Sequence, residues 1–212
     1  LLSKSTLYIN LEPCYHFGKT PPCSDLIIKH KIPKVVIGCI DTYSEVSGSG
    51  IEKMRNAGID VKVGIMEKES RELNKRFFTF HEKKRPYIIL KWAESKDEFI
   101  ALKNQTEPLW MTSDKSKKLV HKWRSEEDAI LIGRITAEKD NPSLTVREIK
   151  GDNPIRIVID KDLKLSENLN LFNSESETII FNEIKSDNQS DNNYIKIEFN
   201  NLINNILEEL YK

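Results

Sequence analysis

Apolar runs alternate with charged, helix-like segments along the first third of the chain. Residues 7–11 form a β-branched and apolar run, which stops at Glu12-Pro13 because proline cannot donate to a strand ladder. Three strands and two intervening helices are predicted: strands at residues 7–11, 34–40 and 59–65, and helices at residues 24–31 and 51–57. This alternation favours a parallel or mostly parallel sheet.

A long charged helix and a proline end this region. Residues 67–84 read as one helix, and the basic stretch before Pro86 marks a domain boundary, because a helix stops before a proline. Residues 87–93 are apolar without alternation, which predicts a strand buried on both faces. Lys91 lies inside this run, and burying an unpaired ammonium is costly. Its amine therefore either reaches solvent at the strand end or meets an anionic ligand.

The remainder of the chain continues in the same α/β style. Ser113 is a predicted N-cap for a helix at residues 114–124, because its hydroxyl can accept a hydrogen bond from an amide of the first turn. Four more strands and a final helix are predicted: strands at residues 128–133, 155–160, 177–182 and 194–199, and a helix at residues 201–211. Residues 186–193 are polar and of low complexity, so they need not be ordered.

Composition narrows the class of protein. The 212 residues are 38% hydrophobic, enough for one large or two small domains, and 33 basic residues balance 33 acidic ones. A net charge of zero gives no support to a nucleic-acid partner. No apolar run reaches the roughly 18 residues that span a bilayer. Three cysteines do not make a disulfide scaffold, so a reducing cytoplasm is the simplest location.

Two of the cysteines are placed as metal ligands. Cys14 follows the first strand, and Cys23 opens a helix, where the macrodipole lowers a thiol pKa. A soft metal such as zinc suits two thiolates. The pair alone is weak evidence for a metal, because two unrelated buried thiols are the more common explanation of so wide a spacing. Nucleotide deaminases carry His-x-Glu and then Pro-Cys-x-x-Cys. Here eight residues separate the cysteines, and His-x-Glu is absent. Cys39, inside an apolar run, is predicted to be an ordinary core residue.

The whole string LEPCYHFGKTPPC at residues 11–23 is more specific than the pair. It resembles the zinc loop of the bifunctional deaminase/reductase family of riboflavin biosynthesis. This resemblance implies that Cys14 and Cys23 are zinc ligands, and that His16 and Lys19 contact a phosphoribosyl pyrimidine. The family's His-x-Glu precedes this loop, so the chain is expected to begin after its third ligand and proton shuttle.

The loop after the second strand also has a counterpart in that family. It begins with Asp41, at a position where the family helps to define the pyrimidine pocket, although Thr42-Tyr43 replaces the usual Pro-Asn. Gly48-Ser49-Gly50 faintly resembles a phosphate cradle, but two glycines are also common in turns.

Two further strings resemble the reductase domain of the same family. One is KWAESKDEFIA followed by LWMTS, and the other is GRITAEKDNPSLTVR at residues 133–147. Glu94, Glu98 and Pro108 depart from the pattern; the family usually has glycine where this chain has Glu98. The resemblance implies two sets of contacts: substrate at Lys91, Arg124, Leu144 and Arg147, and NADPH at Ala93, Trp110, Thr136 and Asp140. Asp140 is also the candidate catalytic residue of the reductase.

Together these features predict a two-domain α/β protein. Residues 1–84 are expected to be a cytidine-deaminase-like domain lacking its beginning, and residues 86–212 a dihydrofolate-reductase-like domain lacking its end. The resemblance implies zinc-hydroxide deamination of 2,5-diamino-6-(5-phosphoribosylamino)pyrimidin-4-one, followed by NADPH-dependent reduction of the ribosyl ring. The chain by itself is expected to be inactive as a deaminase. A cytoplasmic homo-oligomer with a small-molecule substrate, and without nucleic-acid or membrane partners, is expected.

Two alternatives stay open at this point. One is a monofunctional nucleotide or nucleic-acid deaminase with an unrelated second domain, against which the neutral charge and residues 133–147 argue. The other is a non-catalytic, zinc-stabilised module, which the cysteine pair alone permits.

Overall fold

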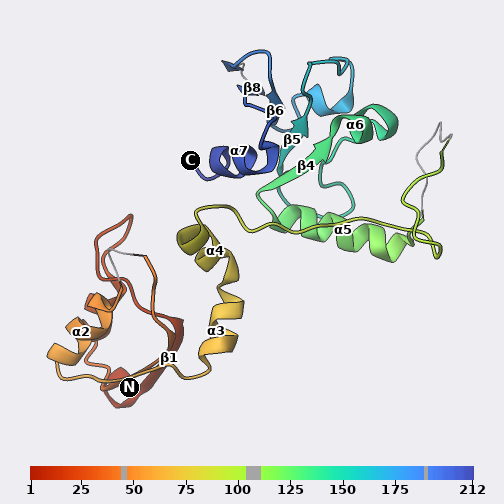
Figure 1. Ribbon diagram of the computed structural model, residues 1–212. Coiled ribbons are helices and arrows are strands. Elements are labelled where there is room, and N and C mark those ends of the chain that lie inside the picture. The colour runs from red at the N-terminus through yellow and green to blue at the C-terminus, as the bar shows by residue number, and fades with distance from the viewer. Residues whose placement is uncertain (44–46, 104–110, 189–190) are drawn as a thin grey trace. The chain divides into compact units, whose positions relative to one another are not determined.

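The computed structural model describes residues 1–43, 47–103, 111–188 and 191–212. They form two compact units: Leu1–Ile88 with Leu207–Lys212, and Ile89–Ile206 (Figure 1). Each unit has its own sheet and its own buried apolar cluster. The division into functional domains at residues 84–86 stays a prediction.

The first unit contains a parallel sheet of three strands in the order β1-β2-β3. Its elements follow the predicted alternation: η1 Leu2–Lys4, β1 Thr6–Leu11, α1 Cys23–Lys29, β2 Lys34–Cys39, α2 Ser49–Asn56 and β3 Asp60–Val63. The prediction of a parallel sheet is confirmed. Because all three strands run the same way, Leu11 and Cys39 are paired, and the chain leaves β1 and β2 at the same edge.

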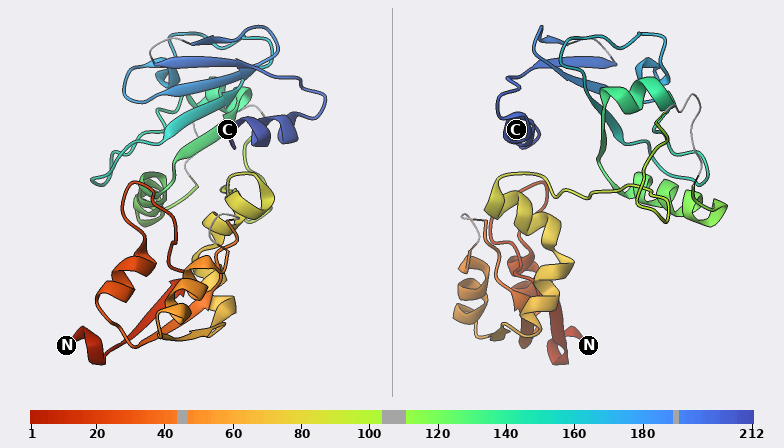
Figure 2. Two further views of the ribbon diagram at one scale, coloured as in Figure 1. Left: turned by 90° about the vertical axis from the view of Figure 1, so that its left-hand side faces the viewer. Right: turned by 45° about the vertical axis from the view of Figure 1, so that its right-hand side comes forward.

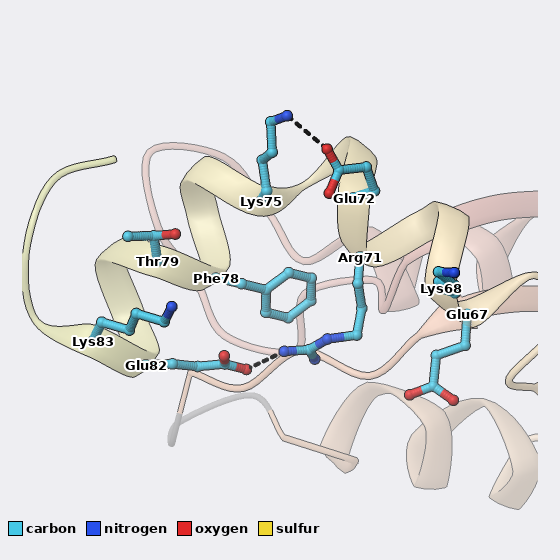
Figure 3. Close-up of a pocket in the computed structure, with 9 residues that line it drawn as sticks. All are labelled: Glu67, Lys68, Arg71, Glu72, Lys75, Phe78, Thr79, Glu82 and Lys83. Carbon is cyan, nitrogen blue, oxygen red and sulfur yellow. Dashed lines mark hydrogen bonds and ion pairs between the residues drawn. The ribbon is translucent and has the colours of Figure 1, made fainter. Parts of the chain in front are cut away.

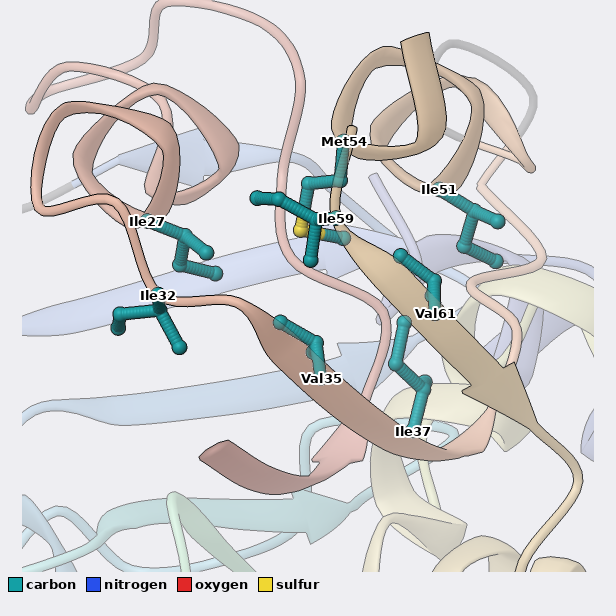
Figure 4. Close-up of a cluster of buried hydrophobic side chains, with 8 residues drawn as sticks. All are labelled: Ile27, Ile32, Val35, Ile37, Ile51, Met54, Ile59 and Val61. Carbon is teal, nitrogen blue, oxygen red and sulfur yellow. The ribbon is translucent and has the colours of Figure 1, made fainter. Parts of the chain in front are cut away.

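Apolar residues of this sheet and its helices share one core (Figure 4). Ile27 of α1, together with Ile51 and Met54 of α2, packs with Val35 and Ile37 of β2.

Helix α3 (Glu67–Leu73) contacts β1 and β2 from the other side, so helices cover both faces of the sheet (Figure 2). A Cβ at Gly38 would lie 2.0 Å from Ser70 Oγ, so the close approach of α3 requires glycine in β2.

The predicted helix at residues 67–84 is two helices. Helix α3 ends at Leu73, and α4 (Lys75–Lys83) begins after Asn74, whose φ and ψ of −99° and 20° lie outside the helical region. The Asn74 side chain also donates hydrogen bonds to Ser70 O at 2.8 Å and to Asn10 Oδ1 at 3.2 Å. This competition for the backbone carbonyl explains the break.

The second unit contains a five-stranded sheet in the order β4-β5-β6-β8-β7. Only β7 runs antiparallel to its neighbour among the described strands. The elements are α5 Asp114–Glu126, β4 Ala129–Gly133, α6 Arg134–Asp140, β5 Ile155–Ile159, η2 Asn170–Phe172, β6 Thr178–Asn182, β7 Asp187–Asn188, β8 Asn192–Lys196 and α7 Leu202–Glu209. Ala137 of α6, Val158 of β5, Leu171 of η2 and Ile180 of β6 form the centre of its core.

Local signals set the ends of several of these elements. Ser113 Oγ accepts a hydrogen bond from Ser116 N at 3.3 Å, which confirms the predicted N-cap of α5. The polar stretch at residues 186–193 contributes Asp187–Asn188 to the sheet as β7, while residues 189–190 lie outside the described part of the chain. No helix among the described residues is long and apolar enough to cross a membrane.

The predicted strand at residues 87–93 is wrong. The structure has no strand there, and Leu90 and Trp92 are 78% and 61% exposed. Lys91 is exposed as well, so the expectation that it lies within a buried strand is also wrong. A strand exists only where its backbone pairs with another strand, and among the described residues this segment has no partner. An apolar run supplies the side chains of a strand but not its neighbour.

Candidate functional site

The thiols of Cys14 and Cys23 lie side by side where β1 ends and α1 begins. The Cys23 backbone N–H donates to Cys14 Sγ at 3.1 Å, while the Ser24 N–H and hydroxyl donate to the Cys14 carbonyl at 3.2 and 3.0 Å. Both cysteines are free thiols. The side-chain hydrogen bond between them, followed by burial, raises the pKa of Cys23. This direction is opposite to the lowering expected from the helix N-terminus.

A buried glutamate lies directly before this thiol pair. Glu12 is 4% exposed, and its carboxylate accepts hydrogen bonds from four backbone N–H groups of the stretch after β2. Oε2 accepts from Asp41 at 3.3 Å and Gly48 at 3.0 Å. Oε1 accepts from Gly50 at 3.1 Å and Ile51 at 3.2 Å. Glu12 is not among the site residues predicted from the sequence. Its position directly before Pro13-Cys14 in the string LEPC could have indicated that it belongs to the site.

These contacts show that Gly48 and Gly50 bind the Glu12 carboxylate, whereas the sequence faintly suggested that they bind a phosphate. Gly48 is the N-cap of α2 with φ +80°, a conformation that favours glycine, and it has no side chain to cap the helix. A Cβ at Gly50 would lie 2.2 Å from Pro13 O. The amides that could bind an external phosphate instead bind the Glu12 carboxylate. The stretch is therefore an internal anion site, filled by the protein itself.

Other predicted deaminase residues lie around this point. Asp41 is buried and its Oδ1 accepts the Tyr43 N–H at 2.7 Å. The ring centroids of His16 and Tyr43 are 6.2 Å apart, and those of Tyr43 and His81 of α4 are 5.1 Å apart. His16 Nδ1 is buried with no hydrogen-bond partner among the described residues. Lys19 is exposed.

The donor set at this site fits half of a tetrahedral zinc centre. Two thiols are adjacent, which suits zinc, but the described residues contain no group of three His, Cys, Asp or Glu side chains that could hold a metal. Cys39 is not a third ligand: it is 1% exposed and its thiol donates to Asn10 O at 3.0 Å. Burial raises its pKa, and the prediction that it is a core residue is confirmed.

A second cluster joins α5 to the chain that follows α6. Arg124 Nη1 donates to Thr145 O at 2.7 Å, and Arg147 Nη1 donates to Thr145 Oγ1 at 3.4 Å. Burial and the nearby Arg147 charge both lower the pKa of Arg124. The structure thus brings together two of the predicted substrate residues, and two guanidinium groups held this way suit an anion such as a phosphate.

His121 belongs to this cluster and was not predicted from the sequence. It is 3% exposed, and its Nδ1 accepts the Arg147 backbone N–H at 3.1 Å. Burial first, and then the charges of Arg124 and Arg147, lower its pKa. The spacing of His121 and Arg124, three residues apart on one helix, could have indicated that they share a face.

Two left-handed residues shape the loop between α6 and Arg147. Asn141 ends α6 with φ +38°, and its side-chain oxygen accepts the Asn170 N–H at 2.8 Å. Leu144 has φ +54° and is 7% exposed. The loop is therefore anchored at both ends, with Leu144 in the core and Thr145 held by Arg124.

Among the described residues, the other predicted cofactor residues, Ala93, Thr136 and Asp140, make no hydrogen bond or ion pair with one another. Thr136 lies exposed in the first turn of α6, and Asp140 is exposed at its last residue. Ala93 is half-buried in the irregular segment after Lys91. Trp110 and the Pro108 departure lie outside the described residues.

A hollow of about 630 Å³ lies beside α3 and α4, and its lining includes none of the predicted site residues (Figure 3). Four of its charged side chains form two pairs: Arg71 with Glu82 at 2.6 Å, and Lys75 with Glu72 at 2.6 Å. The Arg71 guanidinium also lies 4.0 Å from the centroid of the Phe78 ring. Two of its cations are thus already paired with two of its carboxylates, and none of the site residues predicted from the sequence lines it.

Comparison with known proteins assigns the family. The family model for the RibD C-terminal domain matches residues 86–212. This chain belongs to the RibD family. The riboflavin biosynthesis protein RibD of Aquifex aeolicus is 45% identical over 177 residues, covering 83% of this chain and 49% of that protein. RibD of a Synechocystis strain is 37% identical over 215 residues, covering 98% of this chain and 58% of that protein.

Solved structures agree with this assignment. A diaminohydroxyphosphoribosylaminopyrimidine deaminase/5-amino-6-(5-phosphoribosylamino)uracil reductase from Thermotoga maritima matches with a TM-score of 0.84 and 39% identity, over 95% of this chain and 57% of that one. RibD of Acinetobacter baumannii matches with a TM-score of 0.79 and 28% identity, over 95% of this chain and 58% of that one. The chain spans about half the length of the curated relatives it matches.

The family resemblance expected from the sequence is therefore confirmed. The α/β class with parallel sheets is also confirmed, as is a RibD reductase-like domain of the dihydrofolate-reductase type in the second part of the chain.

Proposed function

We propose that the complete protein carries out two successive steps of riboflavin biosynthesis. It deaminates 2,5-diamino-6-(5-phosphoribosylamino)pyrimidin-4-one and then reduces the ribosyl ring of the product to a ribityl chain with NADPH. The observation that carries the proposal is the presence, in one RibD-family chain, of both a thiol pair and a pair of arginines, Arg124 and Arg147, that donate to the same threonine. The first unit serves as part of a cytidine-deaminase-like domain.

In the deamination step, Cys14 and Cys23 would hold zinc, together with a ligand from outside the described residues. Bound zinc supplies an activated water near neutral pH. His16 and Asp41 bind and orient the pyrimidine, and Lys19 adds a positive charge for its phosphate. The burial of Asp41, and the buried Nδ1 of His16 without a partner among the described residues, support these roles.

In the reduction step, Arg124 and Arg147 bind the substrate phosphate, with Lys91 adding a point charge. Leu144 forms an apolar wall beside them. Ala93, Trp110 and Thr136 bind NADPH, which supplies the hydride. Asp140 would lie between cofactor and ribose and pass a proton to the oxygen that is released from the ring when hydride reaches the ribose carbon. The proximity of Arg124 and Arg147 supports this arrangement. A cytoplasmic location and self-association stay predictions.

One experiment tests both steps. The complete protein is incubated with the diaminopyrimidinone phosphoribosyl substrate and NADPH, while ammonia release and NADPH loss are followed in one cuvette. Ammonia release followed by NADPH loss is the expected result. Ammonia release without NADPH loss would refute the reductase assignment. The absence of both signals would refute the whole proposal.

A cysteine variant separates a catalytic from a structural metal. Cys14→Ser is expected to abolish ammonia release, while NADPH loss with the deaminated substrate and the unfolding transition stay unchanged. Cys39→Ala, a buried cysteine outside the pair, should keep both activities. Loss of folded protein in Cys14→Ser alone would instead indicate a structural, non-catalytic metal.

A further inference from the structure

The stretch between β2 and α2 donates hydrogen bonds from both of its ends to one buried carboxylate. Glu12 accepts hydrogen bonds from Asp41 at its start and from Gly48, Gly50 and Ile51 at its end. Both ends of the stretch are therefore held by a side chain that precedes Cys14 by two residues.

We propose that Glu12 is a positioning residue of the deaminase site, which sets Asp41 in place relative to Cys14. The role rests on the deamination proposed above. Glu12 is linked to Cys14 by covalent chain through Pro13, and to Asp41 by the hydrogen bond at 3.3 Å. The Asp41 carboxylate in turn accepts the Tyr43 N–H at 2.7 Å, so its direction follows the backbone that Glu12 holds.

The chemistry of the contact requires an acceptor with two oxygens. The Gly50 and Ile51 amides belong to the first turn of α2, where amides have no partner within the helix. Gly48 offers no capping side chain, and the close approach of Gly50 to Pro13 O excludes any residue with a Cβ. A glutamine at position 12 would direct an NH₂ group toward amide donors, so it could satisfy only one half of this set.

A cap that serves stability alone makes a different prediction from a positioning residue. Loss of a purely structural contact lowers the amount of folded protein, and with it zinc content and every activity together. Loss of a positioning contact leaves the fold, the zinc and the reductase intact, but shifts Asp41 away from the substrate. The Michaelis constant for deamination then rises more than the turnover number falls.

The test uses the complete protein with Glu12→Gln, Glu12→Asp and Glu52→Gln. Glu52 is an exposed carboxylate in the first turn of the same helix, so it is a matched control. Zinc per chain, the unfolding transition, NADPH oxidation with the deaminated substrate, and kcat and KM for ammonia release are measured for each variant.

Glu12→Gln is expected to lower kcat/KM for ammonia release by about 10-fold or more, mostly through KM, with zinc content and reductase rate unchanged. Glu12→Asp, which keeps the carboxylate, should recover part of this loss, and Glu52→Gln should behave as wild type. Deamination by Glu12→Gln within about twofold of wild type would overturn the positioning role, as would a parallel loss of zinc and both activities.

If Glu12→Gln does not fold, Glu12→Asp decides by the same split between KM, zinc and reductase rate. Failure of the wild-type protein to release ammonia would refute the proposed function itself, which is a separate outcome. Normal wild-type deamination with unaffected Glu12 variants would overturn only the role of Glu12.

Discussion

At the scale of single residues, Glu98 has a left-handed backbone conformation, which is the one that favours the glycine expected at this position from the family pattern. Its φ is +66°, and its N–H donates to Ser95 O at 3.0 Å, closing a turn in which Ser95 N–H also donates to Phe99 O at 2.9 Å. A left-handed conformation costs a residue with a Cβ about 1 kcal/mol. The departure in sequence is therefore accommodated as backbone strain, and the shape of the turn is retained.

Glu98→Gly is expected to stabilise the second unit by up to about 1 kcal/mol, because glycine adopts a positive φ without this cost. Urea unfolding followed by tryptophan fluorescence measures the change, since all three tryptophans of the sequence, at positions 92, 110 and 123, fall within the residue range of this unit. Lys96→Gly, in the same turn without a positive φ, should lower stability by about 0.5 kcal/mol. A less stable Glu98→Gly variant would contradict the prediction.

Arg156 shows how a buried charge can hold a loop. It is 0% exposed at the second position of β5, and its guanidinium donates to Asn170 O at 3.0 Å, to Asn173 Oδ1 at 2.8 Å and also to the Ser176 carbonyl. Burial lowers its pKa. The planar fork of arginine reaches several carbonyls at once, which the single ammonium of lysine cannot do.

Arg156→Lys is therefore expected to destabilise the second unit by about 2–4 kcal/mol, because several buried carbonyls lose their donor. Arg134→Lys is the matched control: Arg134 forms an i,i+4 pair with Glu138 on the surface of α6, and its replacement should cost less than about 0.5 kcal/mol. The same urea unfolding experiment compares the two variants. Equal effects of the two substitutions would show that the Arg156 contacts contribute nothing specific.

At the scale of elements, α5 is attached to the loop after α6 through a histidine that must stay neutral. His121 Nδ1 accepts the Arg147 N–H. Burial most strongly opposes a positive charge on its ring, Arg124, Arg147 and Lys117 oppose it as well, and Glu148 favours it. Because its pKa is lowered on folding, the unfolded chain binds the proton first. The stability contributed by the neutral ring is present above the ordinary histidine pKa of about 6.5, and is lost as the pH falls toward the folded value.

The free energy of unfolding of the second unit should therefore decrease as the pH is lowered from 7.5 to 5.5. His121 is its only histidine, since the other three lie at positions 16, 30 and 81 in the first unit. Tryptophan fluorescence during urea unfolding at both pH values measures the difference. His121→Asn keeps an acceptor that does not titrate, and it should remove most of the dependence on pH. An unchanged pH dependence in this variant would assign the effect to other groups.

At the scale of the whole molecule, the two units have separate cores. The eight buried residues of the first cluster come from β2, β3, α1, α2 and the adjoining loops, whereas the second cluster comes from α6 and the chain that follows it. Met54, at 0% exposure, lies in the first cluster. Independent cores predict that damage to one unit leaves the other folded.

Met54→Ala is expected to destabilise the first unit by about 2–5 kcal/mol through the cavity it creates. Hydrogen exchange measured by mass spectrometry should show faster exchange in peptides from β1 to β3, with peptides from β4 to β8 unchanged. The tryptophan-detected transition should also stay in place. A shift of that transition would show that the two units unfold together.

Much of the fold could be predicted from the sequence because it depends on local patterns. The period of apolar residues located β1 to β3 and the helices between them, and the hydroxyl of Ser113 located the start of α5. Arg147 lies inside one family string, whereas Arg124 lies outside the strings and was proposed as its partner in binding a phosphate; the structure places both around the same threonine. Neither the break at Asn74 nor the absence of a strand at residues 87–93 followed from those patterns.

The sequence by itself determined the elements, the α/β class and the family, because side-chain period and motif spacing are properties of neighbouring residues. Only the tertiary structure decided the contacts of Glu12 and His121 and the exposure of Lys91. Glu12 meets amides 29 to 39 positions away, and His121 meets an amide 26 positions away. Lys91 is exposed because its segment lacks a pairing partner among the described strands. Such contacts depend on how distant segments pack, and local patterns carry little information about that packing.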